Sequence, residues 1–256
     1  MTGRYYRQST DKLAACVAEM NAQHADFLIE LGDFKDQNPR PVEQRTLGYL
    51  ETIESVFQRF NGPTYHVLGN HDMDGLSKAQ VLARIRNAGI DASRAYYSFG
   101  VKGLHLIVLD ANYKSDGADY DHGNFTWSDA NVPAKELDWL KQDLAAARGP
   151  AIVFVHQLLD GTRPETVKNA AEVRAVLEAS GKVLAVFQGH LHSGAYSQIA
   201  GIHYYTLPAV VEGDGPENNT YAIVQVHPDG ALTVTGYHKA PTRELTPATS
   251  MPASPR

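Results

Sequence analysis

The chain has 256 residues, of which 43% are hydrophobic and 20% are charged. This composition supports one substantial core and excludes wholesale disorder. The formal net charge is −6, so the chain lacks the basic surface that nucleic-acid-binding proteins use. A single cysteine, Cys16, excludes an internal disulfide framework.

Membrane and secretion signals are not found in the sequence. No stretch approaches the roughly 18 apolar residues of a membrane span, and residues 1–7 lack the apolar core of a signal peptide. We therefore expect neither nucleic acid nor a membrane as a partner. A cytoplasmic location is expected, unless a signal peptide stands upstream of Met1.

Helical and strand-like patterns alternate along the chain. Helices are predicted at 13–20, 47–60, 77–89, 137–144 and 165–179. Strands are predicted at 26–31, 64–68, 95–99, 104–109, 151–155, 183–187, around 204, at 221–226 and at 232–234. Because no linker or repeat divides the chain, we expect a single α/β domain over 1–240 and a flexible, proline-rich tail at 241–256.

Several predicted strands end in side chains that can bind metals. These are Asp33, Asn70 with His71, His156, and His190 with His192. Each motif alone also suits a turn or a packed side chain, but in an open α/β sheet the carboxyl ends of the strands form the ligand crevice. The mixture of imidazole, carboxylate and amide ligands favours Mn, Fe or Zn over Mg or Ca, and the lack of thiolates excludes a structural zinc site.

The order of these motifs resembles that of the calcineurin-like metallophosphoesterase superfamily. The matching motifs are Gly32-Asp33-Phe34-Lys35-Asp36, Gly69-Asn70-His71-Asp72, His156 and Gly189-His190-Leu191-His192. Two further segments are similar to the manganese-dependent ADP-ribose/CDP-alcohol diphosphatase branch: Arg4-Tyr5-Tyr6-Arg7-Gln8-Ser9 and Leu109-Asp110-Ala111-Asn112. The resemblance implies a four-layer α/β/β/α sandwich that hydrolyses a phosphodiester or pyrophosphate bond of a small molecule with metal-activated hydroxide.

The resemblance also implies roles for individual residues. By this resemblance Asp33 bridges two metal ions, which are Mn, Fe or Zn. Asn70, His156 and His190 complete one metal site, and His192 serves the other. His71 protonates the leaving oxygen or stabilises charge on the phosphoryl group. Asp36 orients His71, because a carboxylate fixes the imidazole tautomer and raises its basicity.

One motif of the family has no counterpart here. The family carries Asp-x-His or Asp-x-Gln on a strand before the first helix, and no such motif precedes the helix at 13–20. We therefore expect the fold to lack its first strand, the first metal site to keep only Asp33 and His192, and the chain to hold about one metal ion. The open sheet edge also predicts self-association into a homo-oligomer. A late start of the chain and a divergent protein with one strong metal site both explain the difference.

Other candidates do not replace the first motif. His24, Asp110, His122 and His203 do not stand at the expected place, and His66 and His105 are expected to pack or to lie behind the ligands. The polar and aromatic segment 112–131 is expected to overhang the site, either as a substrate-contacting lid or as a packed surface loop.

Rival functions follow from the same residues. A phosphomonoesterase would use the same metal core, and a catalytically weak metal-binding scaffold would explain the absent first motif. The sequence has no glycine-rich loop of the P-loop or dinucleotide type, so it gives no support to ATP- or NAD-dependent chemistry.

Overall fold

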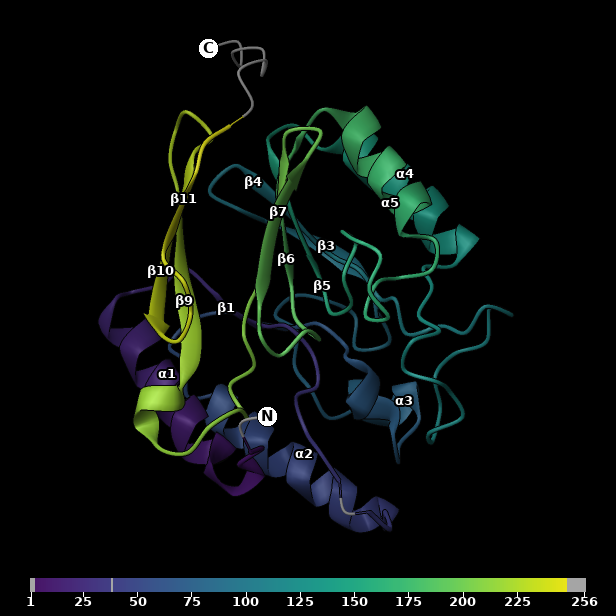
Figure 1. Cartoon of the computed structure of the whole chain (residues 1–256), viewed down its shortest axis with the longest axis vertical. Helices are drawn as coiled ribbons and strands as arrows, with labels where there is room; N and C mark the ends of the chain where they lie inside the picture. The colour runs from purple at the N-terminus through teal and green to yellow at the C-terminus, as the bar shows by residue number, and fades with distance from the viewer. Residues whose placement is uncertain (1–2, 38, 248–256) are drawn as a thin grey trace.

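The computed structural model describes residues 3–37 and 39–247 (Figure 1). Its largest sheet has six strands in the order β3-β4-β5-β6-β8-β7. The strands are β1 (Leu28–Glu30), β2 (Thr64–His66), β3 (Tyr97–Val101), β4 (Leu104–Val108), β5 (Ala151–Val155), β6 (Val183–Gln188), β7 (Ala195–Ile199), β8 (Ile202–Thr206), β9 (Thr220–Val226), β10 (Leu232–His238) and β11 (Arg243–Leu245). Neighbouring strands from β4 to β8 are parallel, whereas β3 and β7 form antiparallel edges.

Helices lie on both sides of the strands. They are α1 (Ser9–Ala22), α2 (Glu43–Phe57), α3 (Lys78–Leu82), α4 (Ala134–Ala146) and α5 (Ala170–Ser180), with 3-10 turns η1 (Tyr6–Gln8), η2 (Asn70–Met73) and η3 (Pro216–Asn218). No described helix is long and apolar enough to cross a membrane. The structure therefore has the α/β organisation that the sequence predicts, with mixed sheets and flanking helices.

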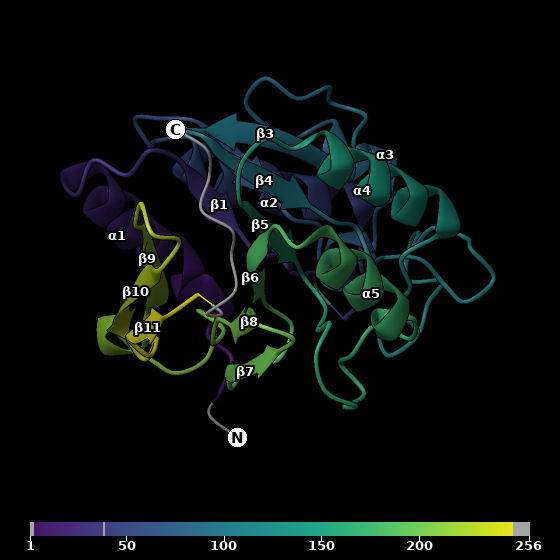
Figure 2. The same ribbon diagram turned by 90° about the horizontal axis from the view of Figure 1, so that it is seen from above.

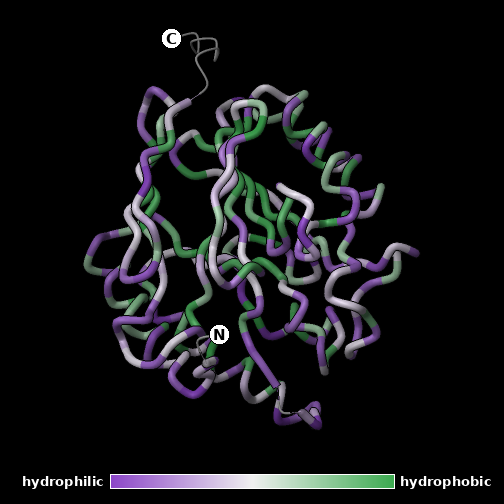
Figure 3. The backbone as a smooth tube through the Cα atoms, in the orientation of Figure 1, coloured by the Kyte–Doolittle hydropathy of each residue, from purple (hydrophilic) through white to green (hydrophobic). Residues whose placement is uncertain are grey.

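Helices α4 and α5 cover one face of the large sheet (Figure 2). Leu137, Leu140 and Leu144 recur at helical spacing on α4 and pack in one core cluster with Val153 of β5 and Val186 of β6. Both faces of the central strands β5 and β6 are covered, so these strands are nearly continuous apolar runs. Figure 3 shows that hydrophobic residues are concentrated in these central strands.

The other face of the large sheet packs against two smaller sheets. One is the parallel pair β1-β2, and the other is the antiparallel sheet β11-β10-β9. Side chains from both small sheets share a core cluster with β4, β5, β6 and β8. Helix α1 packs outside them, with Cys16 and Val17 in a cluster that includes Leu28 of β1 and Tyr221 of β9.

The two small sheets are separate. Between them lies a cavity of about 960 Å³, lined by Leu28 to Leu31 of the β1 segment and by Thr220 and Tyr221 of β9. Among the described residues, no strand pairs with the edge of β1 opposite β2, or with the edge of β9 opposite β10. The backbone groups along these edges are thus not used in a sheet ladder.

Three segments differ from the sequence prediction. The helix predicted at 77–89 is only the short α3, because the chain then turns back and Ala88 N donates to Thr64 O at 3.1 Å. The helix predicted at 165–179 begins later, because the segment before α5 bonds to the loop after β5. Within the predicted flexible tail, β11 pairs with β10; residues 248–256 lie outside the described part.

Candidate metal centre

The candidate centre is built where two pairs of parallel strands end. Asp33 follows β1, Asn70 follows β2, His156 follows β5 and His190 follows β6. Because the sheets pack face to face, their carboxyl ends meet at one place, where His156 Nδ1 after β5 lies 2.6 Å from Leu31 O after β1. The sequence predicts that these strands end in one open sheet, but β1 and β2 form a separate small sheet. The strand ends converge because this small sheet stacks on the large one.

Glycine at position 69 allows the loops after β1 and β2 to approach closely. A Cβ atom on Gly69 would overlap the backbone nitrogen and the Oδ1 atom of Asp33. The backbone of Gly69 is extended, with φ −99° and ψ 167°, so the reason for glycine here is space and not conformation.

The Gly69→Ala substitution is therefore expected to displace Asp33 and to lower the metal content of the chain. Gly48→Ala is the matched control, since a Cβ on Gly48 meets nothing within 4 Å. The metal content of both variants checks this, and equal metal content in the two variants would show that the close approach is unimportant.

Three side chains form the core of the centre. Asp33 Oδ2 lies 3.2 Å from His156 Nε2, and His156 Nε2 lies 3.1 Å from His190 Nδ1. The ligand atoms of the three residues all lie within 4.8 Å of one another. His156 is almost fully buried, at 2% exposure. A carboxylate and two imidazoles therefore point at a common position.

The hydrogen bonds around this cluster fit a cation. His156 Nδ1 lies 2.6 Å from Leu31 O, and because a carbonyl only accepts, this nitrogen is the donor and Nε2 is left facing Asp33. Two buried atoms of the candidate ligands, His190 Nε2 and Asn70 Oδ1, have no hydrogen-bond partner among the described residues. Nitrogen and oxygen atoms of these kinds are those that Mn, Fe and Zn accept as ligands.

The charges of the cluster agree with this fit. Burial raises the pKa of the Asp33 carboxyl, but the positive charges of His156 and of other histidines outweigh it and hold that pKa well below its usual range. Burial, and then the charge of His156, lower the pKa of His190 to about 3. Asp33 is consequently ionised and His190 is neutral, which are the forms that bind a metal. Burial lowers the pKa of His156, but the Asp33 carboxylate raises it more, so a bound metal would displace the proton that His156 Nε2 shares with Asp33.

His71 lies beside the cluster and has a different partner from the one the sequence predicts. Its backbone nitrogen donates to Asp33 Oδ1 at 2.8 Å, and its ring Nδ1 lies 2.5 Å from Asp74 Oδ2. The sequence assigned the orientation of His71 to Asp36. The ligand atoms of Asp36, His71 and Asp74 lie within 4.8 Å of one another, but Asp36 Oδ1 accepts from Gln37 N. Asp74 is the direct partner because the turn η2 brings it next to His71.

The His71 ring is accessible from solvent, since 39% of its side chain is exposed. The hydrogen bond with Asp74 raises the pKa of His71 to about 9, against the opposing effect of burial. With Nδ1 engaged by Asp74, Nε2 is the ring nitrogen that remains for a ligand.

His192 lies outside the three-residue cluster but lines the same cavity as Asp33. Its Nδ1 atom is 2.8 Å from Glu212 Oε1, and Glu212 is also 3.7 Å from Arg4 Nε. A carboxylate that holds one ring nitrogen leaves the other free, as in many metal-binding histidines. No local pattern links Glu212 to His192, because the two residues are 20 positions apart in the chain.

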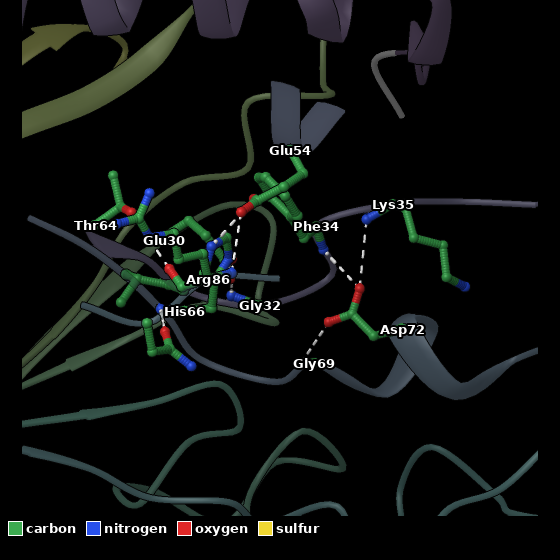
Figure 4. A network of polar contacts seen from close by, with 12 residues as sticks. Glu30, Gly32, Phe34, Lys35, Glu54, Thr64, His66, Gly69, Asp72 and Arg86 are labelled. Atoms are coloured by element: carbon green, nitrogen blue, oxygen red, sulfur yellow. Dashed lines mark hydrogen bonds and ion pairs between the residues drawn. The ribbon is translucent and has the colours of Figure 1, made fainter. Parts of the chain in front are cut away.

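A buried ionic network supports the loop that carries Asp33 (Figure 4). His66 lies between two carboxylates, with Nδ1 3.0 Å from Glu30 Oε1 and Nε2 3.2 Å from Glu54 Oε2. Glu30 Oε2 in turn accepts from Gly32 N at 2.6 Å. The sequence predicted only a packing or supporting role for His66. Its charged partners could have been suspected from the acidic residues that interrupt the apolar patterns of 26–31 and 47–60.

Asp72 joins the two loops of the centre, as Figure 4 also shows. Its Oδ2 atom accepts from Gly69 N at 2.8 Å, and its Oδ1 atom accepts from Phe34 N at 2.9 Å. Asp72 is 1% exposed. The last residue of the Gly-Asn-His-Asp motif thus fixes the loop after β2 to the loop after β1.

The other candidates that the sequence offered do not join the cluster. Asp110 pairs with Lys78 at 2.7 Å, and His105 Nε2 lies 2.5 Å from Asp143. His203 Nδ1 lies 2.9 Å from the Tyr196 hydroxyl. Within the described residues, neither possible metal cluster includes His24, Asp110, His122 or His203.

Comparison with known proteins agrees with this geometry. The family model for calcineurin-like phosphoesterases matches residues 6–194. A manganese-dependent ADP-ribose/CDP-alcohol diphosphatase from Oryza sativa is 28% identical over 90% of this chain and 83% of its own length. A probable cyclic nucleotide phosphodiesterase from Fibrobacter succinogenes is 23% identical, over 79% of this chain and 72% of its own length.

The crystal structure of a dimetal phosphatase from Danio rerio has the same fold. It superposes with a TM-score of 0.83 at 20% identity, and the match covers 97% of this chain and 92% of that protein. The family model, the order of the motifs and the convergence of their side chains lead to one conclusion. The chain belongs to the calcineurin-like phosphoesterase family.

Proposed function

We propose that this chain is a metal-dependent phosphohydrolase that cleaves the pyrophosphate or phosphodiester bond of a small molecule, with nucleoside-diphosphate compounds such as ADP-ribose or CDP-alcohols as its substrate class. The observation that carries the proposal is the convergence of Asp33, His156 and His190, with His71 beside them. The names of the plant relative and of similar relatives from animals support the substrate class.

The proposed ligands divide between two positions. Asn70, His156 and His190 would hold one metal tightly with Asp33, whereas Asp33 and His192 alone would hold a second metal only weakly. Manganese is the proposed ion, because the diphosphatase relatives are manganese-dependent, and iron and zinc suit the same donors. A bound ion would supply Lewis-acid charge and lower the pKa of a coordinated water towards ~7.

The described residues also suggest how the substrate is handled. His71 is held by Asp74 at Nδ1, so its Nε2–H faces outward and can donate to the leaving oxygen of the phosphoryl group. Asp36 adds negative charge near this pair, which helps to keep the His71 proton in place. Lys35 Nζ donates to the His71 carbonyl and so fixes the turn that carries the ring.

The fold we propose is the four-layer α/β/β/α sandwich of the family with one strand position open. The order of packing supports it: α4 and α5, the large sheet, the two small sheets, and then α1 with α2. The open position is the cavity between β1 and β9, which reaches Asp33 and His192. This opening also favours the rival function of a weakly active metal-binding protein.

Turnover measurements with manganese separate these functions. We expect hydrolysis of ADP-ribose and of bis-p-nitrophenyl phosphate, and much slower hydrolysis of p-nitrophenyl phosphate. Asp33→Asn is the inactive control. Faster hydrolysis of the monoester would establish the phosphomonoesterase instead, and metal binding without hydrolysis of any ester would establish the scaffold.

The His71→Ala substitution is expected to lower turnover by about 10²–10⁴-fold without loss of metal, because it removes a proton donor and no ligand. Asp74→Asn is expected to cost more than Asp36→Asn, since only Asp74 bonds the ring directly. Steady-state kinetics and metal analysis of the three variants check this. Loss of metal from His71→Ala would make His71 a ligand, and a larger effect of Asp36→Asn would assign the orienting role to Asp36.

A further inference from the structure

The segment 112–131 is fixed next to the candidate centre. Gly123 N donates to Met73 O at 2.9 Å, and His122 N donates to Leu76 O at 3.1 Å. These bonds attach the middle of the segment to the last residue of the turn η2, which carries His71, and to the chain just after it. Its end is attached as well, since Lys168 N donates to Ala130 O at 2.8 Å.

Aromatic packing makes this segment rigid. Tyr120 is fully buried and stacks on Phe125, with ring centroids 4.0 Å apart and an interplanar angle of 4°. Just beyond Phe125, the backbone forms a turn in which Asp129 N donates to Thr126 O at 2.8 Å. Trp127 lies within this turn, so its position is set by anchored residues on both sides.

Trp127 is exposed at the edge of the metal cluster. Its ring centroid is 5.6 Å from that of His190, at an angle of 59°, and 44% of the residue is exposed. Because the Trp127 ring is partly exposed, the protein lacks the stabilisation that burial of this apolar surface would give. Tyr5, Tyr6 and Tyr49 are also exposed, and they line the cavity that reaches Asp33. Aromatic surface is thus offered close to the place where a phosphate would bind.

We propose that Trp127 is a specificity residue that stacks on the nucleobase of the substrate whose phosphate binds at Asp33, His156 and His190. The inference rests on the proposed function and adds the residue that would read the base. A tilted ring beside His190 has one face directed away from that imidazole, and a planar heteroaromatic group can cover it. The exposed apolar area that the free protein leaves in water would then be buried by substrate.

Stacking gives a measurable contribution to binding. Base–aromatic stacking changes affinity by about 5- to 150-fold per base. The effect is confined to ligands that carry a base, so it separates stacking from a general structural role. If Trp127 merely supported His190, then its removal would weaken every phosphate ligand and would also lower the metal content.

The first test uses the manganese-loaded full chain and compares AMP with ribose 5-phosphate in equilibrium binding. Trp127→Ala is expected to weaken AMP binding about 5- to 150-fold, with no comparable loss for ribose 5-phosphate and no loss of metal. Trp127→Phe should retain most of the affinity for AMP. Trp139→Phe is the matched control, because Trp139 packs against Tyr96 on the helix side of the sheet.

The second test does not depend on the folding of a Trp127 variant. The sequence has two tryptophans, so in Trp139→Phe the fluorescence reports Trp127 alone. AMP is expected to quench it and ribose 5-phosphate is not. Equal weakening of both ligands in the first test, or no response to AMP in either test, would overturn the proposal. Specific AMP binding without hydrolysis of any ester would retain the stacking site and reject the proposed function.

Discussion

The His66→Leu substitution is expected to lower the free energy of unfolding by about 3–5 kcal/mol, the usual cost of removing one partner of a buried ion pair. The substitution leaves Glu30 and Glu54 buried without the cation that faces both of them. Glu30 also holds Gly32 N, so the loop with Asp33 is expected to loosen. Denaturant unfolding measures the loss. His227→Leu is the exposed control, and a loss below about 1 kcal/mol would show that the network is weak.

The same network predicts how stability depends on pH. Burial lowers the pKa of His66, but its bonds to Glu30 and Glu54 raise it more, to about 9 from an ordinary 6.5. The folded chain therefore holds the proton more tightly than the unfolded chain, so this stabilisation is complete below pH 6.5 and is lost as the pH rises through 9. Unfolding measured from pH 6 to 10 should show this decline in the wild type and a smaller one in His66→Leu. Parallel curves would contradict the assignment.

Supplying one strand to the cavity between β1 and β9 is expected to raise both stability and metal content. A synthetic extended peptide with alternating valine and an Asp-x-His end would pair with the free edges of these strands and bring a carboxylate and an imidazole towards Asp33 and His192. We expect Tm to rise by several degrees, because each kcal/mol added to the free energy of unfolding raises the Tm of a domain of this size by about 2–4 °C.

The control for this experiment is the same peptide with Asn-x-Ala at its end, which should raise Tm but not metal content. Size-exclusion chromatography gives a further check, because free sheet edges favour self-association and a bound strand should reduce it. If neither peptide changes Tm, then the cavity does not accept a strand.

The convergence of the candidate site could be expected from the sequence, because each motif follows a predicted strand. Asp33, His156 and His190 are brought together in this way, although they are distant in the chain. Apolar runs identified the strands reliably, since β5 and β6 are buried on both faces. Local pattern and global fold agree here, which is what makes such a prediction possible.

The partners of these residues were less predictable, because they depend on side-chain placement. Asp36 and Asp74 are both near His71 in the sequence, and only the geometry of the turn η2 decides for Asp74. The residues that pair with His66 and His192 come from other elements. Helix α3 is shorter than its periodicity suggests because tertiary bonds to β2 outweigh helix propensity.

The most direct test of the metal centre is the manganese content of the purified chain after dialysis, measured together with that of two variants. We expect about one tightly bound ion per wild-type chain, its loss in His156→Ala, and its retention in His105→Ala, whose side chain bonds Asp143 away from the centre. Unchanged metal content in His156→Ala, or a wild-type chain without bound metal, would contradict the assignment of Asp33, His156 and His190 as ligands.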